Sequence, residues 1–286
     1  MHELTVPRRV GRTSRLVRYC RLVLAGSVIS FFVVVALFPG MFAPHSPSAI
    51  ITDRRLEGPS RDFWFGTDDL GRDILSRIVY GTRISFAVAF GSVLVTVLGG
   101  VSFGVVAGYF RGMWEWSLMR LVDVMLCFPP YVLAVLVVGF AGPGILKLVI
   151  VIGLLYIPRM ARLVHSATLS IRELDYVEAE RAVGAPDSRI ITRVILPNIS
   201  APIIVQATLM LGTAILLESG LSFLGLGVPP PTPSWGDLIG RGRTFMTNNP
   251  WGVVFPAGVL TIVVLAFNLF GDALRDYLDP RLRGSE

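Results

Sequence analysis

The sequence predicts an all-α membrane protein with six transmembrane helices and both termini in the cytoplasm. Charged residues make up 16% of its 286 residues, whereas soluble domains carry roughly 25%. The mean hydropathy is +0.65. Six apolar runs approach the about 20 residues that a helix needs to cross a hydrocarbon core of about 30 Å. A soluble globule of this composition would expose too much apolar surface, so the bilayer is the expected solvent.

The first expected span covers residues 22–43 and follows a basic tail. This run is longer than the roughly 7–15 apolar residues of a signal peptide, which favours a retained span. The alternative is cleavage after Ala43, against which Pro44 argues because it follows directly.

The second run, residues 84–110, contains Gly100, Gly104 and Gly108 at a spacing of four, close to one helix face. Small residues on one face let a second backbone approach closely. The alternative is glycine scattered along a membrane helix without a packing role.

Three further runs are long enough to span, over residues 122–142, 199–228 and 253–271. The first contains Pro129-Pro130, and the second carries one acid, Glu218.

The run at residues 145–164 has a short charge-free centre, Leu148–Pro158. We expect Lys147 to reach one interface and Arg159 and Arg162 to emerge at the other, because long cationic side chains can snorkel.

Arginines in the short loops set the orientation. Six precede residue 22, and six more lie between residues 159 and 193. Both segments are therefore expected inside, which requires an even number of spans between them and favours counting the run at 145–164. The net charge of +6 follows from this topology. Nucleic-acid binding is not expected, because the basic tail lacks interleaved aromatic residues and adjoins a span.

The predicted organisation has five parts. They are a basic cytoplasmic tail (1–21), a first transmembrane helix (22–43), an extracytoplasmic loop (44–83), a core with five transmembrane helices (84–271) that includes a cytoplasmic loop (166–197), and a cytoplasmic tail (272–286).

No catalytic motif is found in the sequence. Lys147 is the only lysine and precedes Leu148, so the chain lacks the Gly-Lys-Ser/Thr of a P-loop. Cys20, Cys127 and the three histidines are scattered without metal-ligand spacing, so no metal site is expected. If transport consumes energy, a partner must supply it.

The cytoplasmic loop has a helix–glycine–helix pattern. Tyr176–Val183 is predicted to be a short helix, Gly184 suits a left-handed C-terminal position, and Pro186 suits the first turn of a second helix. That second helix carries isoleucine and valine on one side and Arg189 and Arg193 on another. The alternative is an interfacial helix resting on the bilayer.

This loop resembles the EAA loop of bacterial ABC-importer permeases. Glu178-Ala179-Glu180 is followed after three residues by Gly184 and after nine more by Val194-Ile195-Leu196-Pro197. The family pattern has alanine at Glu180 and isoleucine at Val194.

Three other stretches resemble the C subunits of dipeptide and oligopeptide permeases. They are Phe65-Gly66-Thr67-Asp68-Asp69-Leu70-Gly71-Arg72-Asp73, Ser222-Phe223-Leu224-Gly225-Leu226-Gly227, and the C-terminal segment from Asn268 to Arg281. Together the motifs cover nearly the whole chain beyond its basic tail, in the order of the family.

The resemblance implies a type I ABC importer permease fold in the bacterial inner membrane, surrounded by lipid. It implies as partners a second homologous permease subunit, two ABC ATPase subunits that hold ATP and Mg²⁺, an extracytoplasmic binding protein and a peptide substrate. It further implies that the EAA loop is a coupling helix seated in an ATPase cleft. The residues assigned to it are Glu178, Ala179, Glu180, Arg181, Ala182, Gly184, Pro186, Leu196 and Pro197.

Two sets of charged residues have open roles. Glu218 either lines the translocation path or forms an interhelical hydrogen bond with a serine or threonine, because an acid at membrane depth needs water or a polar partner. Asp68, Asp69, Arg72 and Asp73 either dock the binding protein, brace the partner permease or form an internally paired turn.

Other interpretations also stay open. The same machinery would suit nickel or another small solute, and the rivals from other classes are an ATP-independent channel or carrier and a membrane scaffold that recruits a cytosolic enzyme.

Replacing Gly184 by valine discriminates among these interpretations. A β-branched side chain is strained in a left-handed backbone conformation, so an importer is expected to lose solute uptake while the chain still inserts normally. Uptake is measured in cells against the amount of chain in the membrane. Unchanged uptake would contradict the docking role of the loop.

Overall fold

The computed structural model describes residues 12–278, and all of its regular elements are helices. They begin with α1 (Arg12–Leu37), α2 (Pro39–Phe42), the short 3₁₀ turn η1 (Thr52–Arg54), α3 (Ile74–Phe110), α4 (Gly112–Leu126) and α5 (Pro130–Ala141). They continue with α6 (Ile145–Arg172), α7 (Asp175–Ala182), α8 (Asp187–Ile190), the π turn η2 (Ile191–Ile195), α9 (Leu196–Phe223), α10 (Trp235–Thr244) and α11 (Trp251–Leu278). The expected all-α class is confirmed.

Five helical stretches in the described residues are long and apolar enough to cross a membrane, and a bent pair raises the count to six. The pair consists of α4 and α5, which meet at 88°. The expected third span over residues 122–142 therefore corresponds to part of a bent pair of helices. Its helix begins earlier, at Gly112, and breaks before Pro130, because a residue that precedes proline disfavours the helical conformation and Pro129 is extended (ψ 122°).

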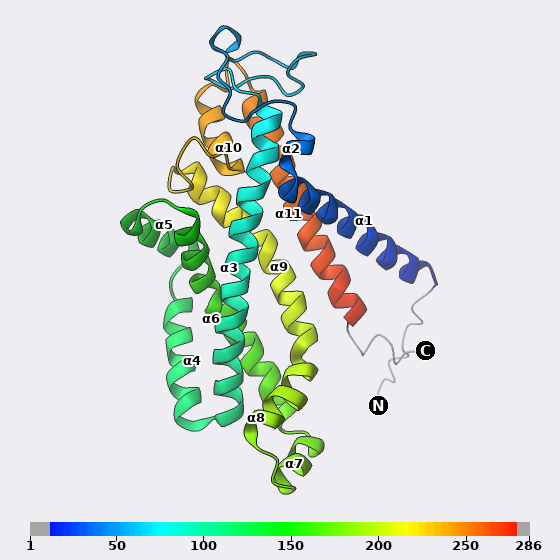
Figure 1. Cartoon of the computed structure of the whole chain (residues 1–286). Coiled ribbons are helices and arrows are strands. Elements are labelled where there is room, and N and C mark those ends of the chain that lie inside the picture. The colour runs from blue at the N-terminus through cyan, green and yellow to red at the C-terminus, as the bar shows by residue number, and fades with distance from the viewer. Residues whose placement is uncertain (1–11, 279–286) are drawn as a thin grey trace, which may run out of the picture.

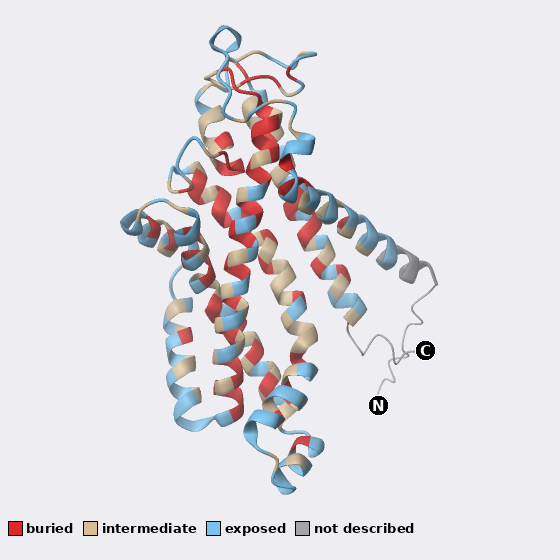
Figure 2. Ribbon diagram, in the orientation of Figure 1, coloured by how far each residue is buried: buried red, intermediate tan, exposed pale blue. Residues whose placement is uncertain are grey.

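The helices α3 and α6 form the centre of the bundle, and α9 and α11 pack beside them (Figure 1). The helix α1 crosses the outside of the bundle against α11. At one end lie α10 and the loop that precedes α3, and at the other lie α7 and α8. Buried residues follow the centre of the bundle, while α1, α4 and α7 are largely exposed (Figure 2).

Glycines on α3 bring its backbone close to α6, as their spacing predicts. A Cβ atom on Gly104 would lie 2.6 Å from the carbonyl oxygen of Ala161, and one on Gly108 would lie 2.8 Å from Cβ of Thr168. From the other helix, a Cβ on Gly153 would lie 2.7 Å from Cβ of Val95. The hydroxyl of Thr96 also donates a hydrogen bond to the carbonyl of Gly153 across the interface (2.9 Å). Scattered glycine without a packing role is thus excluded for this face.

Several helix ends differ from the expected ones. The helix α3 begins at Ile74, ten residues before the expected start of the second span at residue 84. Its first turn is capped by Asp73, whose carboxylate accepts a hydrogen bond from the amide of Ser76 (2.9 Å). The first span ends at Leu37, before Pro39, and α11 continues to Leu278, beyond the expected end at residue 271.

The second helix of the cytoplasmic loop is not separate from the following span. The segment Asp187–Phe223 is one helical stretch, with the π turn η2 directly before α9. A displacement of α8 is therefore transmitted directly to α9.

Substitution of Gly104 by leucine is expected to destabilise the bundle by about 1–3 kcal/mol, because the side chain would have to push α6 away. Gly258 of α11 is the matched control, since a Cβ there meets no atom within 4 Å. Thermal unfolding of the chain in detergent measures the effect. Equal unfolding temperatures for Gly104→Leu and Gly258→Leu would contradict the close approach of α3 and α6.

Candidate functional site

The cytoplasmic end of the molecule presents a small exposed element, α7 and the turn that follows it (Figure 1). Exposed residues of the expected coupling set lie together on this element: Glu178, Ala179, Arg181, Ala182, Gly184 and Pro186. Only Val177 of the helix is fully buried. Val183 is 81% exposed although it is apolar, and the sequence analysis did not assign it. We call this group with Val183 the α7 surface.

A glycine turn ends α7. Gly184 has φ +81°, in agreement with the expected left-handed position. The amide of Ala185 donates to the carbonyl of Glu180 (3.0 Å), and the amide of Gly184 donates to the carbonyl of Arg181 (2.9 Å). This pair of hydrogen bonds is the Schellman motif, which satisfies the last carbonyls of a helix.

The element is anchored on Tyr109, at the cytoplasmic end of α3. The Tyr109 hydroxyl donates a hydrogen bond to Oδ1 of Asp187 (2.5 Å). The guanidinium groups of Arg181 and Arg172 lie 5.0 and 6.0 Å from the centre of its ring, at cation–π distance. No sequence motif pointed to Tyr109. The sequence shows there only a tyrosine near the end of an apolar run, which does not by itself indicate a contact with the cytoplasmic loop.

Glu178 is exposed, and it forms no ion pair with Arg181 or any other residue of the described chain. Arg181 instead covers the Tyr109 ring. Glu180 is partly buried and lies 4.0 Å from Arg189. The remaining residues of the expected set, Leu196 and Pro197, belong to α9.

At the opposite end of the bundle, the charged residues near the start of α3 are paired with one another. Asp68 accepts a hydrogen bond from Nε of Arg72 (2.7 Å) and lies 3.5 Å from Nε of Arg77. Arg77 also lies 3.7 Å from Asp237 of α10, and Asp237 accepts a hydrogen bond from Arg241 (2.8 Å). We call these five residues, with Asp69 and Asp73, the outer ion cluster.

The burial of the outer ion cluster limits which of its side chains can contact another protein. Arg72 is 4% exposed and Asp73 is 2% exposed, so neither offers its side chain to a docking protein. Asp69, 3.8 Å from Arg72, is partly exposed. The hydrogen bond to Asp237 raises the pKa of Arg241. The internally paired turn is therefore observed, and a docking or bracing role for these residues stays a prediction.

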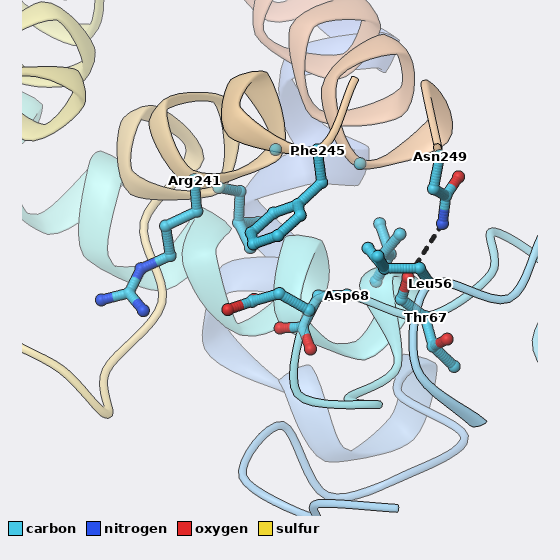
Figure 3. Close-up of a pocket in the computed structure, with 11 residues that line it drawn as sticks. Leu56, Thr67, Asp68, Arg241, Phe245 and Asn249 are labelled. Carbon is cyan, nitrogen blue, oxygen red and sulfur yellow. Dashed lines mark hydrogen bonds between the residues drawn. The ribbon is translucent and has the colours of Figure 1, made fainter. Parts of the chain in front are cut away.

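The cluster adjoins a small cavity between the outer loop and α10 (Figure 3). The cavity holds about 20 Å³, which is room for about one water molecule. The side-chain amide of Asn249 donates to the carbonyl of Thr67 (3.0 Å) at its edge and to that of Glu57 (3.1 Å). These bonds fasten the outer loop to the start of α11.

Glu218 is fully buried, and it lines no surface of this chain. Its carboxylate accepts hydrogen bonds from Ser85 of α3 (2.9 Å), Ser222 (2.7 Å) and Ser219 (3.3 Å). The expected interhelical hydrogen bond, from Ser85 of α3, is thus observed. A role for Glu218 in the translocation path stays a prediction, because the second permease is not part of the structure.

No group of three or more metal-binding side chains occurs among the residues described, 12–278. His2 lies outside that range.

Fold and site together define a multi-pass membrane subunit with an exposed cytoplasmic element and a braced outer end. Residues 100–284 match the family described as "Binding-protein-dependent transport system inner membrane component". The chain belongs to this family and is a permease subunit of an ABC importer in the bacterial cytoplasmic membrane.

Two curated relatives cover nearly the whole chain. The dipeptide transport system permease protein DppC of Alkalihalophilus pseudofirmus is 43% identical over 256 residues, which are 90% of this chain and 84% of that protein. The glutathione transport system permease protein GsiD of Pectobacterium atrosepticum is 40% identical over 270 residues, which are 94% of this chain and 90% of that protein.

Among solved structures, an inward-facing form of the MetNI methionine ABC transporter shares the fold. A chain of that structure superposes with a TM-score of 0.58 at 19% identity, covering 74% of this chain and 98% of that chain. The type I importer permease fold is thereby confirmed.

Replacing Tyr109 by phenylalanine is expected to loosen the α7 surface. The change removes only the hydroxyl that bonds Asp187, at a net cost of about 0.5–1.5 kcal/mol, so the segment should open about 2–13 times more often. Amide hydrogen exchange of residues 175–186 measures this. Tyr176→Phe is the control, because the exposed Tyr176 forms no hydrogen bond with described residues. Equal exchange in both variants would show that the bond does not hold the segment.

Proposed function

We propose that this chain is the permease subunit of an ATP-driven importer of di- and oligopeptides. It pairs with a second, homologous permease and two ABC ATPase subunits, and it receives peptide from an extracytoplasmic binding protein. ATP and Mg²⁺ are held by the ATPase subunits, while this chain catalyses no reaction and holds no cofactor. The peptide substrate rests on the relatives, one named for dipeptides and one for glutathione, which is itself a peptide.

The observation that carries the coupling role is the α7 surface. An exposed valine and an unpaired carboxylate stand together on a short helix at the cytoplasmic end. Such a mixture of apolar and charged groups suits a cleft on a partner protein, because the valine gains burial and the carboxylate gains a counter-charge. Glu178 and Val183 are the proposed anchors of the ATPase contact.

The mechanism follows from the way in which the α7 surface is connected. Closure of the ATPase dimer on ATP displaces α7, and the displacement passes to α3 through Tyr109 and to α9 through the continuous stretch Asp187–Phe223. The tightly packed α3 and α6 move together. At the other end, Arg77 and Asp237 transmit the motion of α3 to α10 (3.7 Å), which changes access from outside.

Uptake in cells that lack this chain tests the substrate. Labelled di-, tri- and pentapeptides, glutathione and nickel are compared with and without a plasmid copy of the gene. ATP-dependent entry of peptide is the expected result. Entry of nickel alone would show that nickel, and not peptide, is the substrate, while the proposed ATP-driven mechanism would still hold. Entry without ATP would favour a channel or carrier, and no entry of any solute would contradict the peptide assignment.

Charge reversal at Glu178 tests the coupling role. Glu178→Arg is expected to reduce uptake about tenfold or more, because a like charge would then face the basic group of the ATPase. Asp276→Arg is the control, with the same charge change at an exposed position near the end of α11. Both variants are normalised to the amount of chain in the membrane, and the ATPase subunits that copurify with each are measured. Equal uptake and equal copurification would contradict the assignment.

A further inference from the structure

A groove at the cytoplasmic half of the bundle carries several polar side chains in a mainly apolar lining. One hollow of about 630 Å³ is formed by α6 and α9 with Leu126 of α4, and a second of about 330 Å³ continues it towards α11. The two share Leu163, Pro202 and Gln206. We call them together the inner groove. Each lies within the about 300–1,000 Å³ that ligand sites commonly occupy.

The polar side chains of the groove come mainly from one face of α6. Arg159, Arg162, Ser166 and Ser170 border the groove, whereas Met160, Ala161 and Val164 on the other face are buried against α3. The four polar residues extend over about 17 Å of helix. Gln206 of α9 adds an amide that forms no hydrogen bond with any described residue.

Arg159 lies deep in the apolar part of the bundle. It adjoins Met160, which faces Gly100: a Cβ on Gly100 would lie 2.5 Å from Cβ of Met160. The first charge on α3 towards the cytoplasm is Arg111, eleven residues beyond Gly100 and therefore about 16 Å further along the axis. The expectation that Arg159 emerges at the interface does not fit this depth.

Arg159 is also without a counter-charge. Arg162 forms an ion pair with Asp123 of α4, but no described carboxylate pairs with Arg159, and its side chain is exposed. Charged residues inside membrane proteins face water-filled cavities or polar partners and mark the path of a substrate. Its depth, its exposure and its place at the edge of a hollow set Arg159 apart from Glu218, which is buried and hydrogen-bonded.

We propose that the inner groove is this chain's wall of the cytoplasmic half of the translocation path, and that Arg159 binds the carboxylate of the passing peptide. The inference rests on the proposed function. A linear peptide carries one terminal carboxylate, for which a guanidinium is a bidentate partner. Its backbone N–H and C=O groups find the hydroxyls of Ser166 and Ser170 and the amide of Gln206. Arg159 shares the groove with Arg162 and, at its far end, with Arg275. Arg162 is paired with Asp123. A few cations among neutral polar groups bind weakly enough to release the peptide, as conduction requires.

Cysteine labelling tests whether the groove contains water. In a chain with Cys20 and Cys127 replaced by serine, Ser166→Cys is introduced, and the complete importer is studied in inverted membrane vesicles with a membrane-impermeant maleimide. In inverted vesicles the import direction runs from the lumen to the outside, so peptide and binding protein are loaded into the lumen. We expect labelling that blocks the ATP-driven release of this peptide. Ser102→Cys is the matched control. Ser102 is exposed on α3 near the depth of Arg162, donates a hydrogen bond only to Leu98 of its own helix (2.7 Å), and does not line the inner groove.

A second cysteine variant keeps the test valid if the Ser166→Cys chain does not fold. Ser170→Cys lies one turn further along the same face and is expected to react as Ser166→Cys does. If neither position is labelled, the face lies against lipid or the second permease, and the proposal is wrong. Labelling of Ser102→Cys to the same extent would also overturn it.

Charge substitution tests the role of Arg159. Arg159→Gln is expected to lower the maximal rate of peptide uptake about tenfold, and Arg159→Lys is expected to restore most of it. The KM for peptide should stay unchanged, because the binding protein captures the peptide before the path is reached. Equal rates for both variants, whether normal or lost, would contradict a carboxylate site.

The unsubstituted importer separates this inference from the function on which it rests. If it takes up no peptide, the proposed function fails. If it takes up peptide while Ser166→Cys and Ser170→Cys stay unlabelled, only the inner groove fails.

Discussion

The close packing of α3 against α6 is the contact on which the rest of the structure depends. In a bilayer the hydrophobic effect does not drive helices together, so association relies on van der Waals contact and a few hydrogen bonds. Glycines at 100, 104 and 108 on α3 and at 153 on α6 remove the side chains that would keep the backbones apart. The hydrogen bond from Thr96 to the carbonyl of Gly153 fixes their register. These two helices therefore act as one rigid unit to which the other elements attach.

Both ends of α3 carry polar contacts that extend this rigidity to the membrane surfaces. At the outer end Asp73 caps the helix, and Arg77 joins it to α10 through Asp237. At the cytoplasmic end Tyr109 holds Asp187 and lies under Arg181. Because one helix of 37 residues connects the two sites, a displacement at α7 reaches the outer loop without passing through flexible chain.

Polar groups inside the bundle occur in two environments, one enclosed by hydrogen-bond partners and one open to a hollow. Glu218 is enclosed by Ser85, Ser219 and Ser222, so its carboxylate makes hydrogen bonds that tie α9 to α3. Arg159 and Gln206 face a hollow and bind no described group. Since an unsatisfied polar group in hydrocarbon is costly, the first arrangement suits structure, whereas the second needs water or a passing solute.

The sequence by itself determined the helical class, the spans, the glycine face of α3 and the left-handed turn at Gly184, because these follow from local composition and spacing. Membership of the permease family also follows from its motifs. Only the tertiary structure decided that the third span is bent, that Arg72 and Asp73 are buried, and that Glu218 is enclosed by serines while Arg159 is open. Ser85 and Glu218 are 133 residues apart, and Tyr109 and Asp187 are 78 apart. No local pattern encodes such pairs, because helix packing alone brings them together.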